Sequence, residues 1–460
     1  MIKALYVNTQ QRVNLDWGST KWFNSEIGLK QGCVLSPILF ALYLKSTGDK
    51  LLKSGIGIEF GNIKIPALFF ADDMILMSNK ADDMNKLLKV LGSILARIKM
   101  EINCSKSQML VIKGERGEVY NWNIINYREQ IVGHLDEVRF YKYLGILCSN
   151  EGRNPFKKHL TKMVSKAKQL GGAIRAKSHA SWDKTGVANA LWNAMACPAI
   201  LYGCEITQFD DQTLKKLEVA QNTMGRWILG ARKFCSSIAL RNELGWKSMK
   251  YRIYEAKLKF WGKICFQDTF RWAKATLMSS INEGWKSKWV DEIMSIREEV
   301  GMDSMYGTRN YKDWCTRVSN TLNAWEKSKF DQAKGSMKSL MWYSTPYNSL
   351  RRLQPYINGT KAASMLFNIK AGCWVLKSTA IGPAKCKFCE EKDSEIHRIF
   401  KCSSLNEKRD ELGISSMVYD LWLHKNSEIE VLSTITLGSR HECLSRGKML
   451  HGLDEFIRNN

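Results

Sequence analysis

Proline is scarce in this chain, which has 7 prolines and 32 glycines among its 460 residues. Long disordered linkers are usually rich in these residues, so the composition argues against them. Acidic residues are also in deficit, with 45 Asp and Glu against 69 Lys and Arg and a net charge of +24. A surface that is merely soluble needs a far smaller imbalance. The excess of positive charge therefore favours a partner with a phosphate backbone.

The sequence also lacks the usual signals for secretion and membrane insertion. Residues 1–5 lead directly into polar sequence, so we expect no signal peptide. The uncharged stretch 187–204 is long enough to span a membrane, but it contains Asn189, Asn193 and Pro198. A buried helix that ends near Pro198 fits these residues better. We therefore expect no membrane association.

Cysteines are numerous but do not form a disulfide pattern. There are 13 of them, an odd number, and they are scattered along the chain. This distribution favours a reducing compartment, the nucleus or the cytoplasm. With 45% hydrophobic residues, the chain can bury a large core in two or three domains. Its 16 tryptophans can serve either as core residues or as platforms on which bases stack.

Two adjacent acids, Asp72 and Asp73, interrupt an apolar run between Pro66 and Ser78. The run predicts two short strands joined at the acids, with Phe69 and Phe70 in the core. Burying carboxylates beside such strands is costly unless a cation compensates them. Ligands that are all oxygen favour Mg²⁺ or Mn²⁺, the metals of nucleotidyl transfer. The alternative is an ordinary turn, where Asp is common.

A second copy of the same tripeptide lies ten residues later. Ala81-Asp82-Asp83 opens a stretch with apolar residues at helical spacing, from Met84 to Ile98. Acids in the first turn of a helix complement its dipole and need no metal. We therefore predict a helix here and no catalytic role for this pair.

The surrounding sequence supports a catalytic role for the first pair. Gly28-Leu29-Lys30-Gln31-Gly32 precedes Leu35-Ser36-Pro37 and an apolar helix, and such a Gly-containing turn lets backbone approach a ligand. Downstream come the patterns INxxKS, which contains Lys106, and YLGI, which contains Tyr143. In this order, QGxxLSPxLF, FADD, INxxKS and YLGI resemble the palm of reverse transcriptases of non-LTR (LINE-type) retrotransposons. The palm resemblance covers roughly residues 5–150, and a looser likeness continues to about residue 425.

The resemblance implies roles for individual residues. Asp72 would bind both catalytic metal ions, with Asp73 supporting the site. Lys106 would stabilise the leaving pyrophosphate or donate a proton to it. The other implied positions contact substrates: Gln31 and Gly32 would line the pocket for the incoming nucleotide and the template base, and Tyr143, Leu144 and Gly145 would hold the primer terminus.

A third carboxylate, which such polymerases carry on an earlier strand, is not evident. Only Asp16 and Glu26 precede Gln31, and Asp16 lies in a sequence typical of a hairpin turn. Asp16 lacks the aromatic and apolar neighbours of the family's first acidic motif, and the fingers that precede that motif are missing too. We therefore expect this chain alone not to polymerise.

Beyond residue 150 the pattern becomes helical. A basic amphipathic helix begins near Pro155 and continues through Lys166, Lys168 and Arg175. In the resembling polymerases a helical thumb follows the palm and grips the template–primer duplex. A solvated helix face is the alternative for any one of these lysines. Residues 250–345 predict several helices rich in tryptophan.

Four metal-binding residues lie close together near the C-terminus. Cys386, Cys389, His397 and Cys402 offer three thiolates and one imidazole, the ligand set of a closed tetrahedral zinc site. His441 and Cys443 are possible substitutes, but their spacing matches no known pattern. Residues 380–405 contain few large apolar side chains, so we expect the metal to order this segment. A CCHC motif of this kind resembles the one that ends many LINE-type polymerases.

The sequence thus predicts an α+β fold with a partial palm (1–150), a helical thumb (151–260), a helical connector (261–375), a CCHC zinc-binding segment (376–425) and a C-terminal tail (426–460). The implied reaction is RNA-templated DNA synthesis, with Mg²⁺ or Mn²⁺ and Zn²⁺ as cofactors. The implied partners are an RNA template, a DNA primer or target, and deoxynucleotides if the palm is complete. Two alternatives stay open: a group II intron maturase-like protein, and a nucleic-acid-binding remnant without catalysis.

Overall fold

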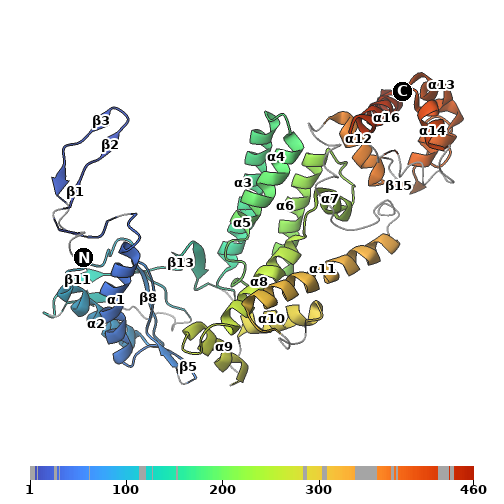
Figure 1. Ribbon diagram of the computed structural model, residues 1–460. Helices are drawn as coiled ribbons and strands as arrows, with labels where there is room; N and C mark the ends of the chain where they lie inside the picture. The colour runs from blue at the N-terminus through green and yellow to red at the C-terminus, as the bar shows by residue number, and fades with distance from the viewer. Residues whose placement is uncertain are drawn as a thin grey trace. The chain divides into compact units, whose positions relative to one another are not determined.

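The computed structural model describes residues 6–7, 9–24, 28–30, 32–61, 63–112, 121–126, 128–151, 154–282, 287–302, 308–336, 360–374, 378–379, 382–422, 435 and 440–459. The chain divides into two compact units, Met1–Tyr141 and Lys142–Asn460 (Figure 1). Helices occur together with small two-stranded sheets, in agreement with the expected α+β class.

The first unit combines short paired strands with two long helices among its described residues. Its helices are α1 (Ser36–Lys53) and α2 (Ala81–Arg97). Its strands are β1 (Gln10–Gln11), β2 (Asn14–Leu15), β3 (Gly18–Ser19), β4 (Phe23–Asn24), β5 (Ile58–Phe60), β6 (Ile63–Ile65), β7 (Ala67–Phe70), β8 (Asp73–Leu76), β9 (Gln108–Met109), β10 (Asn123–Ile125), β11 (Ile131–His134) and β12 (Asp136–Glu137). The pairs β1–β4, β2–β3, β5–β6, β7–β8 and β10–β11 are antiparallel, and β9–β12 is parallel.

Helix α2 begins at Ala81, as the second Ala-Asp-Asp copy predicts. Asp82 and Asp83 lie in its first turn, where carboxylates complement the helix dipole. One face of α2 is buried in the core of the unit, through Met84, Leu87, Leu88, Leu91, Gly92, Ile94 and Leu95. This face packs against β10 and α1. Burial of a full apolar face stabilises this helix.

The second unit is mainly helical. After strands β13 (Phe140–Tyr143), which spans the unit boundary, and β14 (Ile146–Ser149) come α3 (Lys157–His179), α4 (Lys184–Leu191), α5 (Cys197–Ile200), α6 (Asp211–Leu229), α7 (Ser237–Leu244), α8 (Met249–Cys265), α9 (Trp272–Asn282), α10 (Lys288–Glu299), α11 (Tyr311–Ser336), α12 (Lys361–Lys370), α13 (Asn406–Glu411), α14 (Ile414–Trp422) and α16 (Arg440–Asn459). A short β15–β16 pair, Ser378–Thr379 with Gly382–Pro383, precedes the CCHC segment.

Local capping chemistry sets the limits of these helices. The Asp210 carboxylate accepts a hydrogen bond from the Thr213 backbone N–H at the start of α6, and the Ser248 hydroxyl does the same for Tyr251 in α8. Helix α6 ends at Gly230, whose φ of 59° favours glycine. The predicted boundary at residue 260 falls inside α8, which packs against α6, α10 and α11.

The uncharged stretch 187–204 is helical up to Ile200, as predicted. A π-helical turn, Trp192–Ala196, joins α4 to α5. This turn lies directly before Pro198, which lacks a backbone N–H and is therefore accommodated by a change in hydrogen-bond pattern. Trp192 is fully buried and stacks on Trp246, with ring centroids 5.6 Å apart. No helix among the described residues is long and apolar enough to cross a membrane.

The C-terminal helices form one hydrophobic cluster with the CCHC segment. Buried residues of α12 and α16 meet Cys386, Ile399, Cys402 and Leu405 in this cluster, together with Trp374. The sequence predicted a C-terminal tail at 426–460, but residues 440–459 of this stretch form a helix that packs in the core. Helix α12 also contributes Ala363 and Phe367 to the cluster built around α3 and α6.

Candidate metal sites and nucleic-acid interface

The first acid pair lies at the tip of a β-hairpin, as predicted. Strand β7 pairs with β8 so that Phe70 faces Asp73, and Ala71 and Asp72 form the turn. Ala71 has a φ of 53°, a left-handed conformation that usually requires glycine. Strain of this kind is concentrated at functional sites. Both Asp72 and Asp73 are exposed.

Two expectations about this hairpin are wrong. The carboxylates are not buried, so the cost of burial does not itself demand a cation here. Phe69 and Phe70 are 38% and 62% exposed rather than in the core. The physical reason is that few described residues cover this end of the hairpin, although the Phe69 ring faces Gly48 of α1. Helix α1 is similarly open, since Ile38 and Leu42 are more than half exposed.

The turn that precedes α1 is held by side-chain hydrogen bonds. The Ser36 hydroxyl donates to the Lys30 carbonyl oxygen at 2.7 Å, and the Tyr6 hydroxyl lies 3.3 Å from the same Ser36 oxygen. Gly32 has a φ of 80° and open space where a Cβ would be, so glycine suits both the backbone and a close approach by a ligand. Gln31 lies outside the described residues.

Lys106 lies in an exposed turn of the first unit. Its backbone N–H donates to the Asn103 side-chain oxygen at 3.2 Å and to the Asn103 carbonyl at 3.1 Å. Asn103 of the INxxKS pattern therefore stabilises this Asx-type turn through its side-chain oxygen. The long lysine side chain extends from an ordered backbone, and its role at a phosphate stays a prediction.

Asp16 does not complete the acid pair in this arrangement. It lies in the short turn between β2 and β3, at the end of an extended hairpin that projects away from β8 in Figure 1. The turn expected from its sequence is therefore confirmed. Among the described residues, the group of three or more potential metal ligands that lie close together is the CCHC set, not an acidic one.

The Tyr143-Leu144-Gly145 turn joins β13 to β14 and is anchored by the helical core. Leu144 and Gly145 have φ values of 45° and 87°, so both adopt left-handed backbone. The Tyr202 hydroxyl donates to the Leu144 carbonyl oxygen at 2.8 Å, and its ring would lie 3.0 Å from a Cβ at Gly145. Glycine is therefore needed at 145 for both conformation and space.

His159 of α3 extends this anchor. Its Nε2 lies 3.1 Å from the Tyr202 carbonyl oxygen, and the Leu147 backbone N–H donates to its Nδ1 at 3.4 Å. An accepting Nδ1 and a donating Nε2 describe a neutral imidazole. Burial lowers the pKa of His159, and nearby Lys162 and Lys166 act in the same direction. The neutral ring thus links β14 to the Tyr202 segment.

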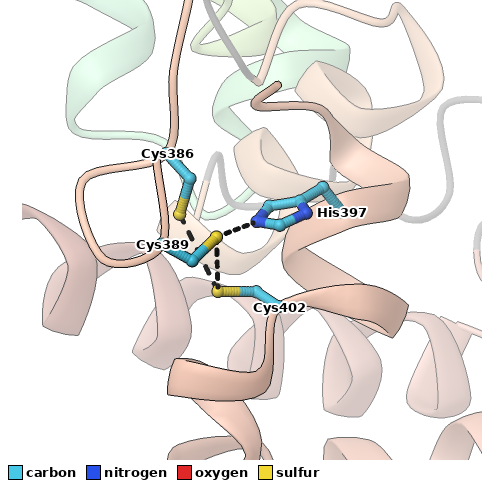
Figure 2. Close-up of side chains that lie close together, drawn as sticks. All are labelled: Cys386, Cys389, His397 and Cys402. Atoms are coloured by element: carbon cyan, nitrogen blue, oxygen red, sulfur yellow. Dashed lines mark hydrogen bonds between the residues drawn. The ribbon is translucent and has the colours of Figure 1, made fainter. Parts of the chain in front are cut away.

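The four predicted zinc ligands converge on one point. Cys386, Cys389, His397 and Cys402 place their ligand atoms within 4.8 Å of one another (Figure 2). The Cys402 sulfur lies 3.8 Å from both the Cys386 and the Cys389 sulfur. Two thiolates on one tetrahedral zinc ion, each about 2.3 Å from it, lie about 3.8 Å apart. The sulfur spacing therefore fits zinc.

Backbone geometry explains how these residues meet. The Cys386 N–H donates to the Glu391 carbonyl at 2.8 Å, and Glu390 has a φ of 62°, so residues 386–391 form a tight knuckle. His397–Lys401 is a π-helical turn in which the Cys402 N–H donates to the His397 carbonyl at 2.8 Å. This turn brings His397 and Cys402 to the same side of the knuckle.

The His397 ring is oriented for metal binding. Its Nε2 faces the sulfurs and lies 3.2 Å from the Cys389 sulfur (Figure 2), while Nδ1 lies 3.4 Å from a Glu391 carboxylate oxygen. Histidine ligands of metals commonly donate their other ring N–H to a carboxylate, which fixes the tautomer. Glu391 was not identified from the sequence, because a single glutamate in an acidic stretch gives no signal.

The electrostatics of the cluster favour a cation. Burial, and the neighbouring thiols of Cys386 and Cys389, raise the pKa of Cys402 to about 12. Three sulfurs this close cannot all be thiolates unless positive charge compensates them. A Zn²⁺ ion would supply that charge, because zinc sites are built from deprotonated cysteines.

The expectation that this segment has too few apolar contacts to be ordered unaided needs correction. The segment itself is poor in large apolar residues, but it packs against α12, α14 and α16. Sequence within residues 380–405 could not reveal these distant partners.

An ionic network fixes the CCHC segment to the helices. Arg398 forms a two-pronged ion pair with buried Asp393, with contacts of 2.6 and 2.9 Å, and its guanidinium lies 5.3 Å from the centre of the Trp374 ring. Asp454 of α16 accepts hydrogen bonds from the Trp374 indole at 2.8 Å and from Arg232 at 3.0 Å. Paired, hydrogen-bonded geometry of this kind is what buried charges require. Sequence analysis missed this network.

Helix α3 presents a face of one charge. It carries six lysines and one arginine in 23 residues and has no acidic residue. Its other face is buried through Leu160, Met163, Val164, Ala167 and Ile174. The exposed lysines are Lys157, Lys158, Lys162, Lys168 and Lys177, of which Lys158 lies 3.5 Å from Glu151. The predicted basic amphipathic helix is confirmed.

Comparison with known proteins agrees with these features. Residues 1–148 match the family described as reverse transcriptase (RNA-dependent DNA polymerase). The chain is 31% identical over 191 residues to the retrovirus-related Pol polyprotein from the type-2 retrotransposable element R2DM of Drosophila melanogaster. It is 26% identical over 158 residues to the corresponding polyprotein from the type-1 retrotransposable element R2 of Nasonia vitripennis.

These matches cover only part of each protein. They include 38% and 33% of this chain, but 18% and 15% of the two polyproteins. The family match spans the Asp72 hairpin, the Gly32 turn, Lys106 and the Tyr143–Gly145 turn. Residues 1–148 are therefore a reverse transcriptase segment, and the two R2 polyproteins to which the chain is similar are of the non-LTR retrotransposon type.

Proposed function

We propose that this chain is the part of an RNA-directed DNA polymerase that supplies two acidic residues of the palm, a helical thumb that binds nucleic acid, and a zinc-binding segment. The observation that carries the proposal is the Asp72 hairpin, which lies within the stretch matched to reverse transcriptases. The acid-free helix α3 supports nucleic-acid binding independently.

In the first unit, Asp72 and Asp73 are proposed ligands of Mg²⁺ or Mn²⁺. Their exposed position at a hairpin tip leaves the carboxylate oxygens accessible to a hard cation. The ions would stabilise the attacking and leaving oxygens of nucleotidyl transfer. Gly32 would let the incoming nucleotide approach the backbone, and Lys106 would stabilise the pyrophosphate. Tyr143, Leu144 and Gly145 would hold the primer end.

In the second unit, α3 is the proposed contact with an RNA template paired to a DNA primer. Its cations are spread along one helix face without competing carboxylates on that helix. Each phosphate that such a residue neutralises contributes about 0.9 to the slope of log affinity against log salt. A reducing compartment, the nucleus or cytoplasm, suits the chain because none of the 13 cysteines is in a disulfide.

Nucleic-acid binding by this chain is tested by titrating a short RNA–DNA hybrid at several salt concentrations. We expect strong salt dependence, and we expect Lys162→Ala/Lys168→Ala to lower the slope by about 1.8. The matched control is Lys361→Ala/Lys312→Ala, which removes two exposed lysines from α12 and α11. An unchanged slope in the α3 variant would contradict the assignment.

A second candidate function, nucleic-acid binding without catalysis, is favoured by one observation. Among the described residues, the close group of metal ligands is the CCHC set, and no third acid joins Asp72 and Asp73. Two ions are poorly held by two carboxylates. We therefore expect no primer extension by this chain on an RNA template with Mg²⁺ or Mn²⁺. Incorporation that is lost in Asp72→Asn but kept in Asp82→Asn would show instead that the site is complete.

A further inference from the structure

We propose that Trp182 is a platform on which an unpaired base stacks, beside the nucleic acid that α3 contacts. This inference rests on the proposed function and adds to it a preference for a junction between duplex and single strand. It is drawn from the turn that joins α3 to α4, where three observations coincide.

The first observation is the exposure of Trp182. The residue lies between His179, the last residue of α3, and Lys184, the first of α4, and it is 73% exposed. The other tryptophans of the second unit whose burial the structure describes are at least partly buried, and Trp192, Trp246, Trp314 and Trp374 are fully so. An indole offers a flat π-face that accepts any base.

The second observation is the charge around this turn. Residues 157–184 contain one acid, Asp183. Its carboxylate accepts a hydrogen bond from the Gly186 backbone N–H at 2.8 Å and caps α4. Lys177 and Lys184 flank the turn on its two sides. The exposed indole therefore lies in a positive environment, which suits a polyanion.

The third observation is that two cations near the turn are held by an aromatic ring. The Lys184 ammonium lies 4.4 Å from the centre of the Trp227 ring, and the Arg175 guanidinium lies 5.8 Å from it. Cation–π contact fixes the position of these groups while leaving their charge uncompensated by a carboxylate. They can then attract a phosphate group.

An exposed aromatic beside positioned cations is the combination with which proteins bind single-stranded nucleic acid. Bases inside a duplex are already stacked on each other and paired, so the proposed stacking on Trp182 requires an unpaired base. The α3 lysines contact phosphates, which both kinds of ligand carry. The α3 lysines therefore provide a contact that any nucleic acid can make, whereas Trp182 provides a contact that only an unpaired base can make.

The test compares a blunt RNA–DNA hybrid with the same hybrid carrying a single-stranded RNA extension, by fluorescence anisotropy at one salt concentration. We expect Trp182→Ala to weaken binding of the extended ligand about tenfold, because stacking on an aromatic residue contributes about 1–3 kcal/mol per base. Binding of the blunt ligand should not change. Trp182→Phe should keep most of the affinity.

Phe270→Ala is the matched control, since Phe270 is 75% exposed in another interhelical turn of the same unit. Loss of affinity for both ligands in Trp182→Ala, loss for neither, or an equal loss in Phe270→Ala would overturn the proposal. Circular dichroism shows whether each variant is folded. Lys162→Ala/Lys168→Ala should weaken both ligands. If that variant changes neither, the proposed function fails; if it weakens both while Trp182→Ala is neutral, the stacking platform alone fails.

Discussion

The two candidate metal sites of this chain differ in how much of each site the described structure contains. The Asp72 hairpin presents two exposed carboxylates on a strained turn. The CCHC segment brings four ligand atoms within 4.8 Å, and Cys386, His397 and Cys402 are buried. The first site depends on groups that are not beside it, whereas the second is complete within a short stretch of chain. The residue types alone did not show which of the two sites is complete. The structure shows it, because the four CCHC side chains converge and no comparable group forms around Asp72 among the described residues.

The largest expected effect is on zinc content. Wild-type chain should bind about one zinc ion, and Cys389→Ser should lose nearly all of it, because a closed site needs its four ligands. Metal analysis by mass spectrometry measures this directly. Cys443→Ser is the matched control, since Cys443 is buried in the same hydrophobic cluster but outside the four ligands. Equal zinc content in wild type and Cys389→Ser would remove the distinction between the two sites.

A second large effect concerns the attachment of the zinc segment. Asp454→Asn should lower the free energy of unfolding of the second unit by about 1–3 kcal/mol, since it removes the buried carboxylate that pairs with half-buried Arg232 and accepts the hydrogen bond of the buried Trp374 indole. Urea denaturation of the zinc-loaded chain measures the change. The neighbouring Glu455→Gln removes an exposed pairing to Lys361 and should cost at most about 1 kcal/mol. Similar losses in the two variants would mean that α16 does not fix the segment.

A smaller effect separates the two Ala-Asp-Asp copies. Asp82→Asn should destabilise α2 by about 0.3–1 kcal/mol, because it removes a charge that complements the helix dipole. Asp72→Asn lies in an exposed hairpin turn and should change the stability of the first unit by at most about 0.5 kcal/mol. Hydrogen exchange of α2 amides reports both changes. A larger loss from Asp72→Asn would give that residue a structural task and weaken its assignment as a metal ligand.

The smallest effect is a pH dependence at His159. Burial lowers the pKa of this side chain in the folded chain, so the unfolded chain binds a proton more readily. Its contribution to stability is therefore complete above the ordinary histidine pKa of about 6.5 and falls as pH drops below it. Thermal unfolding of wild type and His159→Gln between about pH 7.5 and 5.5 should show a weaker pH dependence in the variant. Parallel curves would count against a neutral, buried His159.

Sequence patterns predicted the local elements well, because their causes are local. The turn at Asp72, the start of α2 at Ala81, the basic helix α3 and the four zinc ligands follow from residues that are near one another in the chain. The network of Arg232, Trp374, Arg398 and Asp454 could not be predicted, since its members are up to 222 residues apart. Exposure of Phe70 was also missed, because an apolar strand end looks the same in sequence whether or not other residues cover it.

Helix α1 has a practical consequence for work with this chain. Ile38, Leu42 and Tyr43 are 58%, 61% and 50% exposed, and Val34 just before the helix is 87% exposed. Apolar surface of this kind lowers its free energy by associating with other apolar surface in water. Preparations of the chain should therefore self-associate as concentration rises, and sulfate or phosphate salts should increase this tendency. Affinities measured with this chain need to be independent of its concentration before they are assigned to binding of nucleic acid.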